Sequence, residues 1–117
     1  MHHALGLSLV RLKRLDEALT ELRRAAEIDT NNARYAYIYG VALHSAGRQQ
    51  DALAQLKESL ARHPGNRDIV MAIVSFSRET GDAATALQYA EKAATIAPDD
   101  PAVRVMVEEL RRQAAPR

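Results

Sequence analysis

A fixed internal period constrains this chain more than any other feature of its sequence. When the sequence is shifted by 34 positions, residues of the same kind fall on one another: Gly6 on Gly40, Ala18 on Ala52 and Ala86, Leu22 on Leu56, Gly47 on Gly81, and Pro64 on Pro98. Self-similarity at a fixed period of this length indicates an array of small repeated units, each of which buries a core only by stacking on its neighbours.

Each unit reads as two helices joined by a turn. In the middle unit, apolar residues recur at helical spacing on both sides of Gly47, Asn32 is suited to cap the first helix, and Pro64-Gly65 stops the second. In the first unit, Arg14-Leu15-Asp16 is expected to turn the chain, with Asp16 as the N-cap. The pattern predicts an all-α chain of seven helices without strands, at residues 5–15, 17–28, 33–46, 50–62, 68–80, 83–96 and 102–114.

Small and large residues alternate at fixed places in the three units. The first unit has His2, Leu5-Gly6, Leu9, Ala18, Leu22, Ala25 and Thr30; the second has Ala36, Tyr39-Gly40, Leu43, Ala52, Leu56, Ser59 and Pro64; the third has Val70, Ile73-Val74, Ser77, Ala86, Ala90, Ala93 and Pro98. This pattern resembles the tetratricopeptide-repeat (TPR) family. The resemblance implies a right-handed α-solenoid of antiparallel helix pairs, the TPR superhelix.

The resemblance divides residues 1–117, as a single TPR domain, into repeats at about 1–32, 33–66 and 67–100, followed by a capping helix at 101–115. The sequence opens in the middle of a helical pattern, with no capping residue before it. We therefore expect a fragment of a larger protein. The Ala/Leu/Arg-rich style resembles TPR segments of larger bacterial proteins.

Composition excludes several classes of partner. The net charge is +1 with 26% charged residues, so no strong field attracts nucleic acid or an anionic membrane. No apolar run approaches the ~20 residues that a membrane span needs, and the chain has no cysteine. We expect a soluble protein of the bacterial cytoplasm or periplasm, without nucleic-acid partner or membrane insertion, and the compartment stays open.

Residue types for catalysis do not occur in productive patterns. The histidines His2, His3, His44 and His63 include no pair at the i, i+4 spacing that would put two metal ligands on one helical face. The sequence has no glycine-rich phosphate loop and no nucleophile next to a base. We expect no metal, no cofactor and no enzymatic activity.

Family members of this kind bind an extended peptide or a helix in a concave groove lined by the first helix of each pair. The corresponding positions here are His3, Ala4, Leu7, Val10, Arg11, Arg34, Tyr37, Ile38, Val41, His44, Ser45, Asp68, Met71, Ala72, Ser75, Arg78 and Glu79. Tyr37 is expected to face the groove, Tyr39 the core and Tyr35 the surface, because alternate residues of a helix cannot share one face.

The resemblance implies a non-catalytic protein-interaction module with an unidentified protein or peptide partner. Two alternatives stay open, a self-association module that forms a homodimer, and a structural tail of a larger bacterial enzyme or electron-transfer protein. One subfamily holds the terminal carboxylate of chaperone tails with a Lys/Asn/Arg set, and the corresponding positions here are His3, Leu7, Ile38, Asp68 and Ala72. We therefore do not expect a chaperone-tail carboxylate clamp.

Overall fold

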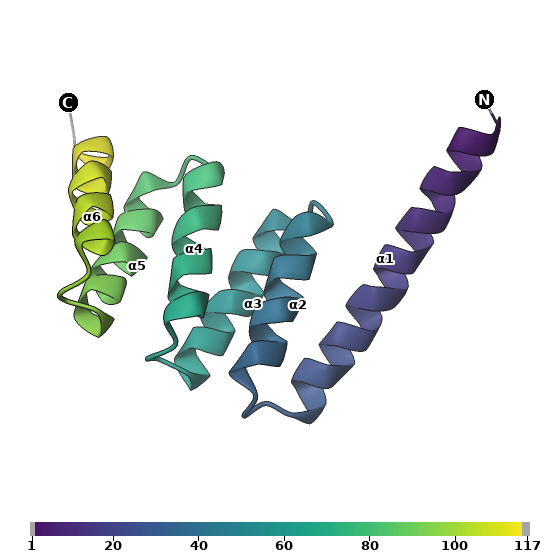
Figure 1. Cartoon of the computed structure of the whole chain (residues 1–117), viewed down its shortest axis with the longest axis horizontal. Coiled ribbons are helices and arrows are strands. Elements are labelled where there is room, and N and C mark those ends of the chain that lie inside the picture. The colour runs from purple at the N-terminus through teal and green to yellow at the C-terminus, as the bar shows by residue number, and fades with distance from the viewer. Residues whose placement is uncertain (1, 116–117) are drawn as a thin grey trace.

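The computed structural model describes the backbone of residues 2–115 and the side chains of residues 13–115. Within this part of the chain there are six helices and no strand: α1 (His2–Ile28), α2 (Ala33–Ser45), α3 (Gln49–Arg62), α4 (Arg67–Glu79), α5 (Ala83–Ile96) and α6 (Pro101–Ala114) (Figure 1). The predicted all-α solenoid is confirmed.

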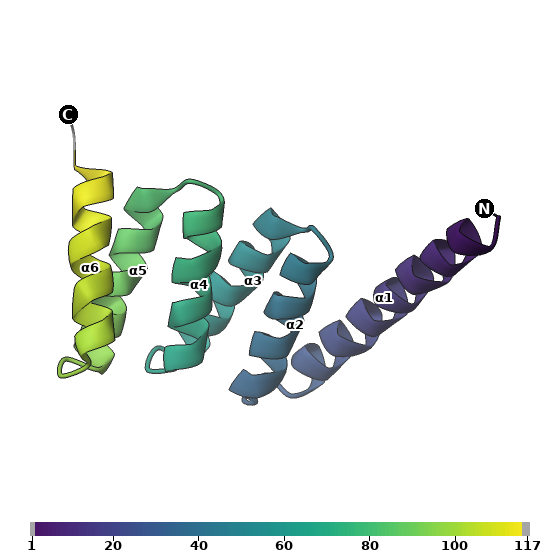
Figure 2. The same ribbon diagram turned by 45° about the horizontal axis from the view of Figure 1, so that its top comes forward.

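The helices pack in chain order. α2 packs on α3, α4 on α5 and α5 on α6, while α2 also touches α4. α2, α4 and α6 form one layer, with α3 and α5 behind it (Figures 1 and 2). The result is an elongated array of 50 × 36 × 21 Å, the shape expected when each unit contacts only its neighbours.

Helix boundaries follow local signals that recur once in every repeat. Asn32, Asn66 and Asp100 cap α2, α4 and α6, and each side chain accepts a hydrogen bond from a backbone N–H of the first turn. Gly47 and Gly81 follow α2 and α4 with φ of +81° and +79°, a backbone conformation that glycine adopts at little cost. Equal spacing of the caps makes α2, α4 and α6 start at equivalent levels of the array.

The first unit departs from the prediction. α1 runs unbroken over 27 residues, so the turn at Arg14-Leu15-Asp16 and the count of seven helices are wrong. Lys13 occupies the place of Gly47 and Gly81, and a lysine enters the left-handed region at a cost of about 1–2 kcal/mol. Asp16 lies inside the helix, where its carbonyl accepts a hydrogen bond from Thr20 Oγ1 at 3.0 Å. The N-terminal half of α1 therefore points away from the other helices (Figures 1 and 2).

The core lies between the later helices. Leu56, Ile69, Ile73 and Leu110 are fully buried there. Ala52 and Ala86 are also fully buried, whereas Ala18 at the same place in α1 is exposed. Ala18 stays exposed because α1 does not fold back on itself. The molecule is thus tightly packed from α2 onward and open at α1.

Candidate functional site

Two hollows adjoin between α2 and α4. The first has a volume of about 320 Å³ and is lined by Ala33, Arg34, Tyr37, Ile38, Asn66 and Asp68. The second has a volume of about 290 Å³ and is lined by Tyr37, Val41, Asp68, Met71, Ala72, Ser75 and Phe76. Because Tyr37 and Asp68 line both hollows, the two form one continuous depression, here called the α2–α4 groove.

The caps of the two helices set the geometry of this groove. Asn32 Oδ1 accepts hydrogen bonds from the backbone N–H groups of Arg34 and Tyr35 at 3.1 and 3.3 Å, and Asn66 Oδ1 accepts one from Ile69 at 3.1 Å. Since these caps are one full period apart, α2 and α4 start in register. Residues related by the same period therefore stand at equivalent levels on the two walls.

The floor of the α2–α4 groove is apolar and its rim is polar. Tyr37, Val41 and Met71 are half-buried and packed against the core, while Ala72 is buried. Arg34 and Asp68 are exposed at the end where the two helices begin. An apolar floor with a few polar groups around it suits the binding of apolar side chains with orientation fixed at the rim.

The opposite end of the groove is closed by an aromatic stack. The rings of His44 and Phe76 are 3.8 Å apart and nearly parallel, at 3°. His44 Nε2 also hydrogen-bonds the Glu79 carboxylate on α4. These contacts fasten the end of α2 to the end of α4, so the two walls of the groove are held at a fixed separation there.

The structure brings most of the predicted groove residues together. Arg34, Tyr37, Ile38, Val41, Met71 and Ser75 line the two hollows. His44 lies at the closed end through its contact with Phe76, and Arg78 is exposed on α4 without lining either hollow. His3, Leu7 and Arg11 lie in the first half of α1, and their side chains fall outside the described residues.

Sequence reasoning missed three lining residues, Ala33, Asn66 and Phe76. Phe76 is the important one, because it connects the groove floor to the His44 stack. Its signal in the sequence was the single phenylalanine of the chain, next to a predicted groove position at Ser75. Asn66 lines the groove where α4 begins, because it is the N-cap residue of that helix.

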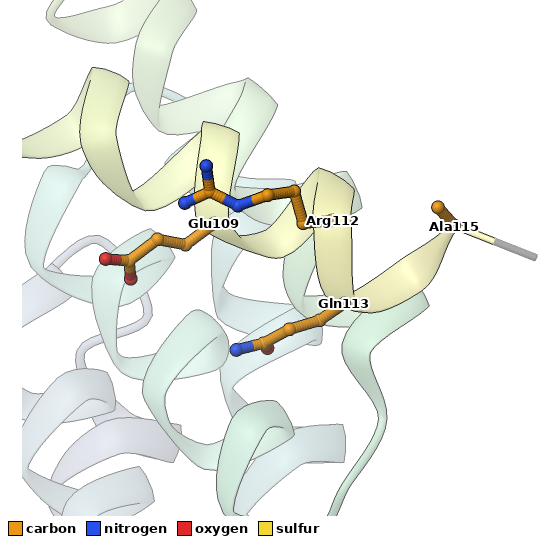
Figure 3. A pocket seen from close by; sticks show the side chains of 4 residues that line it. All are labelled: Glu109, Arg112, Gln113 and Ala115. Carbon is orange, nitrogen blue, oxygen red and sulfur yellow. The ribbon is translucent and has the colours of Figure 1, made fainter.

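A third hollow of about 470 Å³ lies beside the C-terminal end of α6 (Figure 3). It is lined by Glu109, Arg112, Gln113 and Ala115, and the side chains of the first three extend along one side of the helix (Figure 3). α6 and the residue that follows it supply the whole lining, so this hollow lacks the opposing wall that the α2–α4 groove has. The α2–α4 groove, which has two facing walls, is therefore the stronger candidate for a functional site.

The part of the chain with described structure holds no group of three or more histidine or acidic side chains able to bind a metal ion. None of the helices within residues 2–115 combines the length and apolar character needed to cross a bilayer.

Solved structures with the same fold include secretion chaperones. SycD of Yersinia enterocolitica, in complex with a peptide of the translocator YopD, is 13% identical with a TM-score of 0.74 over 96% of this chain and 91% of SycD. PcrH of Pseudomonas aeruginosa, in complex with the chaperone binding region of PopD, is 19% identical with a TM-score of 0.65 over 94% of this chain and 83% of PcrH. MamA is 20% identical with a TM-score of 0.72, over 94% of this chain and 60% of MamA. At these identities the likeness shows the fold.

These complexes correct the expectation about partners. From the sequence we expected an unidentified protein or peptide partner, allowed a homodimer, and did not expect a chaperone-tail carboxylate clamp. The expectation about partners was wrong, because one similar array is the type III secretion chaperone SycD bound to a translocator peptide, and another, PcrH, is bound to the chaperone binding region of PopD. The five positions compared with the clamp set, His3, Leu7, Ile38, Asp68 and Ala72, concern TPR domains that hold the tail of a chaperone. They do not concern TPR proteins that are themselves chaperones.

The family comparison covers most of the chain. No functionally curated protein matches the sequence. The family model of the tetratricopeptide repeat matches residues 3–67 and 46–101. These two segments overlap and together span the predicted repeats. The fold and the family are those of a protein-interaction module, as the sequence predicted. The chain belongs to the tetratricopeptide repeat family.

Proposed function

We propose that this chain is a peptide-binding module that holds an extended segment of a partner protein in the α2–α4 groove. The observation that carries the proposal is the groove itself, with its apolar floor at Tyr37, Val41 and Met71 between two helices fastened at one end. The peptide complexes of the similar chaperones support it, since those arrays have the same architecture.

The chemistry of the groove suggests the kind of segment it binds. Each hollow, at about 290–320 Å³, has room for apolar side chains of a ligand but is too open to enclose a small molecule on all sides. The polar rim at Arg34 and Asp68 offers one donor group and one acceptor group for the backbone or polar side chains of the segment. We infer an extended segment with at least two apolar residues.

The same site argues for binding without catalysis. The His44–Glu79 pair resembles the base and orienting acid of a catalytic triad, but such a pair needs a nucleophile bonded to the second ring nitrogen. Within the described side chains, no hydrogen bond joins a serine or threonine hydroxyl to His44. His44 stacks on Phe76 instead, so we propose that the pair is structural.

Selection from a phage-displayed library of random peptides tests the proposal. Peptides of roughly ten residues reach about 33 Å when extended, enough to cross both walls of the groove. Selected peptides are then synthesised and their Kd is measured by fluorescence anisotropy for the parent chain, for Tyr37→Ala and for Met71→Glu. We expect each variant to weaken binding at least tenfold, which corresponds to about 1.4 kcal/mol.

Tyr89→Ala is the matched control, because Tyr89 is a half-buried tyrosine on α5 that lines neither hollow. It should leave the Kd unchanged. Tyr37→Ala should alter the free energy of unfolding by less than about 1.5 kcal/mol, since the ring is only half-buried. Peptides that bind the groove variants as tightly as the parent, or a library that yields no binders, would refute the proposal.

A further inference from the structure

The face of α2 that looks toward α1 is only partly covered, unlike the same face of α4 and α6. On α2 the face consists of Tyr35, which is 39% exposed, and the half-buried Tyr39 and Ala42. The equivalent residues, one and two periods on, are at most 9% exposed: Ile69, Ile73 and Phe76 on α4, and Val103, Val107 and Leu110 on α6. In α4 and α6 this face packs against the preceding helix pair. The helix pair that would precede α2 is incomplete.

The second half of α1 is uncovered on the matching side. Ala18 is exposed and Leu22 is half-buried. Their equivalents in α3 and α5 are Ala52, Leu56, Ala86 and Ala90, all 0% exposed. In those helices the residues pack against the helix that precedes them in the same pair. α1 lacks that covering helix, because its own first half continues straight on.

Two hollows lie between the second half of α1 and the neighbouring residues of α2 and α3, on a different face of α1 from Ala18 and Leu22. One, of about 190 Å³, is lined by Asp16, Leu19, Thr20, Arg23, Tyr39 and Arg48. The other, of about 360 Å³, is lined by Arg23, Ala26, Glu27, Thr30, Tyr39, Gln55, Glu58 and Arg62. Tyr39 and Arg23 line both, so the open seam runs along α1 with the Tyr39 ring beside it. The Tyr39 ring beside this seam is therefore only half-buried.

One segment of this chain has the position and the sequence to cover these faces. The family match begins at residue 3, so the first half of α1 carries the pattern of a first helix of a TPR pair. The internal period places residues 3–12 where residues 37–46 stand in the next pair. A turn at Lys13-Arg14 would bring this segment back across residues 17–28, as the turn at Gly47 brings α3 back across α2.

We propose that α1 exchanges between the continuous helix and a bent form, in which residues 3–12 fold back and cover the open faces of α1 and α2. The continuous form keeps the helical hydrogen bonds across Lys13 and avoids a left-handed lysine. The bent form gives up those bonds and buries Tyr39, Ala18 and Leu22. Lys13, at the place of Gly47 and Gly81, adds a cost to the bent form, which offsets part of the free energy gained by burial.

The exchange would also change the length of the groove. The predicted groove positions His3, Leu7 and Arg11 fall in the first half of α1, and they would border α2 only in the bent form. This consequence rests on the proposed function, whereas the exchange itself does not. Both tests below use the chain without any ligand, so their failure is distinct from a failure of peptide binding.

The first test compares Lys13→Gly with Lys13→Ala. In a helix that is only ever continuous, glycine is the less stable of the two because it costs more backbone entropy. In the bent form, glycine removes the penalty at the turn. We expect the glycine variant to have the higher midpoint of urea denaturation and a smaller radius of gyration by X-ray scattering. The reverse order of midpoints, with equal radii, would overturn the proposal.

The second test is a disulfide. Gly40 and Leu56 are so close that a Cβ on Gly40 would lie 2.6 Å from Leu56 Cδ2, and Gly6 and Leu22 are the equivalent pair. In a straight helix Gly6 and Leu22 are about 24 Å apart, far beyond the reach of a disulfide. Because the chain has no cysteine, Gly6→Cys with Leu22→Cys introduces a single pair. We expect an intramolecular disulfide on mild oxidation in dilute solution.

Two further pairs calibrate this test. Gly40→Cys with Leu56→Cys should cross-link readily. Gly6→Cys with Arg23→Cys should not, because Arg23 is exposed and its equivalent Lys57 points away from α2 toward the Tyr89 ring. If the Gly6–Leu22 cysteine pair stays reduced while the first control cross-links, α1 does not bend. Cross-links that join two chains only would assign the open face to a second copy and overturn the proposal as well.

Discussion

The two complete helix pairs of this array place their larger and smaller residues on opposite helices at the equivalent crossing. In α2–α3, Gly40 on the first helix faces the large Leu56 on the second; in α4–α5 the equivalent residues are Val74 and Ala90. All four are buried. Each pair contains the same total number of side-chain carbons, distributed differently between the two helices. The comparison teaches that the repeat preserves the volume at the crossing rather than the residue at each position.

The largest expected effect comes from breaking this match. Gly40→Val should destabilise the chain by roughly 2–4 kcal/mol, because a Cβ there would lie 2.6 and 2.7 Å from Cδ2 and Cγ of the fully buried Leu56. Leu56→Ala alone should cost about 2–5 kcal/mol through the cavity it leaves. The double variant copies the α4–α5 crossing into α2–α3, so it should be more stable than either single variant. Urea denaturation measures all three.

Gly65→Ala is the control for the glycine substitution, because a Cβ at Gly65 meets nothing within 4 Å. It should change stability by less than about 0.5 kcal/mol, as substitutions outside the core usually do. Additive losses in the Gly40→Val/Leu56→Ala variant would mean that the two crossings are not equivalent, and the comparison would fail at its main point.

A second difference between the pairs lies one turn further on. Leu43 on α2 is 3% exposed, and the equivalent residue on α4 is Ser77, fully buried with an Oγ that has no hydrogen-bond partner among the described atoms. A buried hydroxyl without a partner costs free energy. Ser77→Ala should therefore raise the free energy of unfolding by about 1 kcal/mol.

Ser59→Ala provides the contrast, because Ser59 is equally buried but its Oγ donates to the Gln55 carbonyl at 2.8 Å. It should not stabilise the chain. If both alanine variants lower the thermal midpoint by similar amounts, the Ser77 hydroxyl has a partner in solution and the difference between the pairs is smaller than described.

The smallest expected effect concerns the second helix of each pair. Asp82 caps α5, where its carboxylate accepts hydrogen bonds from Thr85 Oγ1 at 2.6 Å and Thr85 N–H at 3.0 Å, whereas Arg48 at the same place before α3 makes no side-chain cap. The Thr85 side-chain and backbone hydrogen bonds lower the pKa of Asp82, with a smaller contribution from Lys57. A lowered pKa in the folded state means stability that is present above the ordinary carboxyl pKa and is lost on acidification.

Asp82→Ala should therefore lower the denaturation midpoint at pH 7, and the difference from the parent should shrink below about pH 4, as the pH falls through the lowered pKa. Arg48 has φ and ψ of −93° and 66°, close to the −92° and 77° of Asp82. Arg48→Asp should accordingly stabilise α3 with the same pH dependence. A pH-independent effect of either substitution would show that the cap carboxylate is not responsible.

Most of this fold could be predicted from the sequence because the signals that begin and end its helices are local. Asn32, Asp100 and Gly47 each act within one turn of their own position, so they could be recognised without knowledge of the packing. The error at α1 came from the same source. The period suggested a turn at residues 14–16, but Lys13 stands where the later units have glycine, and lysine is not suited to the left-handed conformation. Where the period and the local signal disagreed, the local signal decided the structure.

The groove was predictable in outline and not in detail. The period alone placed Tyr37 and Met71 on facing walls, since equal cap spacing brings them to equivalent levels. The His44–Phe76 stack was missed, because Phe76 belongs by its position to the face that packs on the preceding pair. Its ring nevertheless lines the groove and stacks on His44, a contact that depends on how the side chains of α2 and α4 pack and that the repeat pattern alone does not indicate.

The even spacing of Asn32, Asn66 and Asp100 has a consequence for the history of this chain. Each block of sequence between two of these positions contains its own beginning, its own reversal and its own end. A gene segment of that length could be duplicated or lost without changing the caps and turns of the neighbouring blocks, and the molecule would become longer or shorter by one whole pair of helices. An insertion of one or two residues would disturb the spacing of these caps. Inheritance would therefore alter this protein more easily by whole blocks than by small insertions.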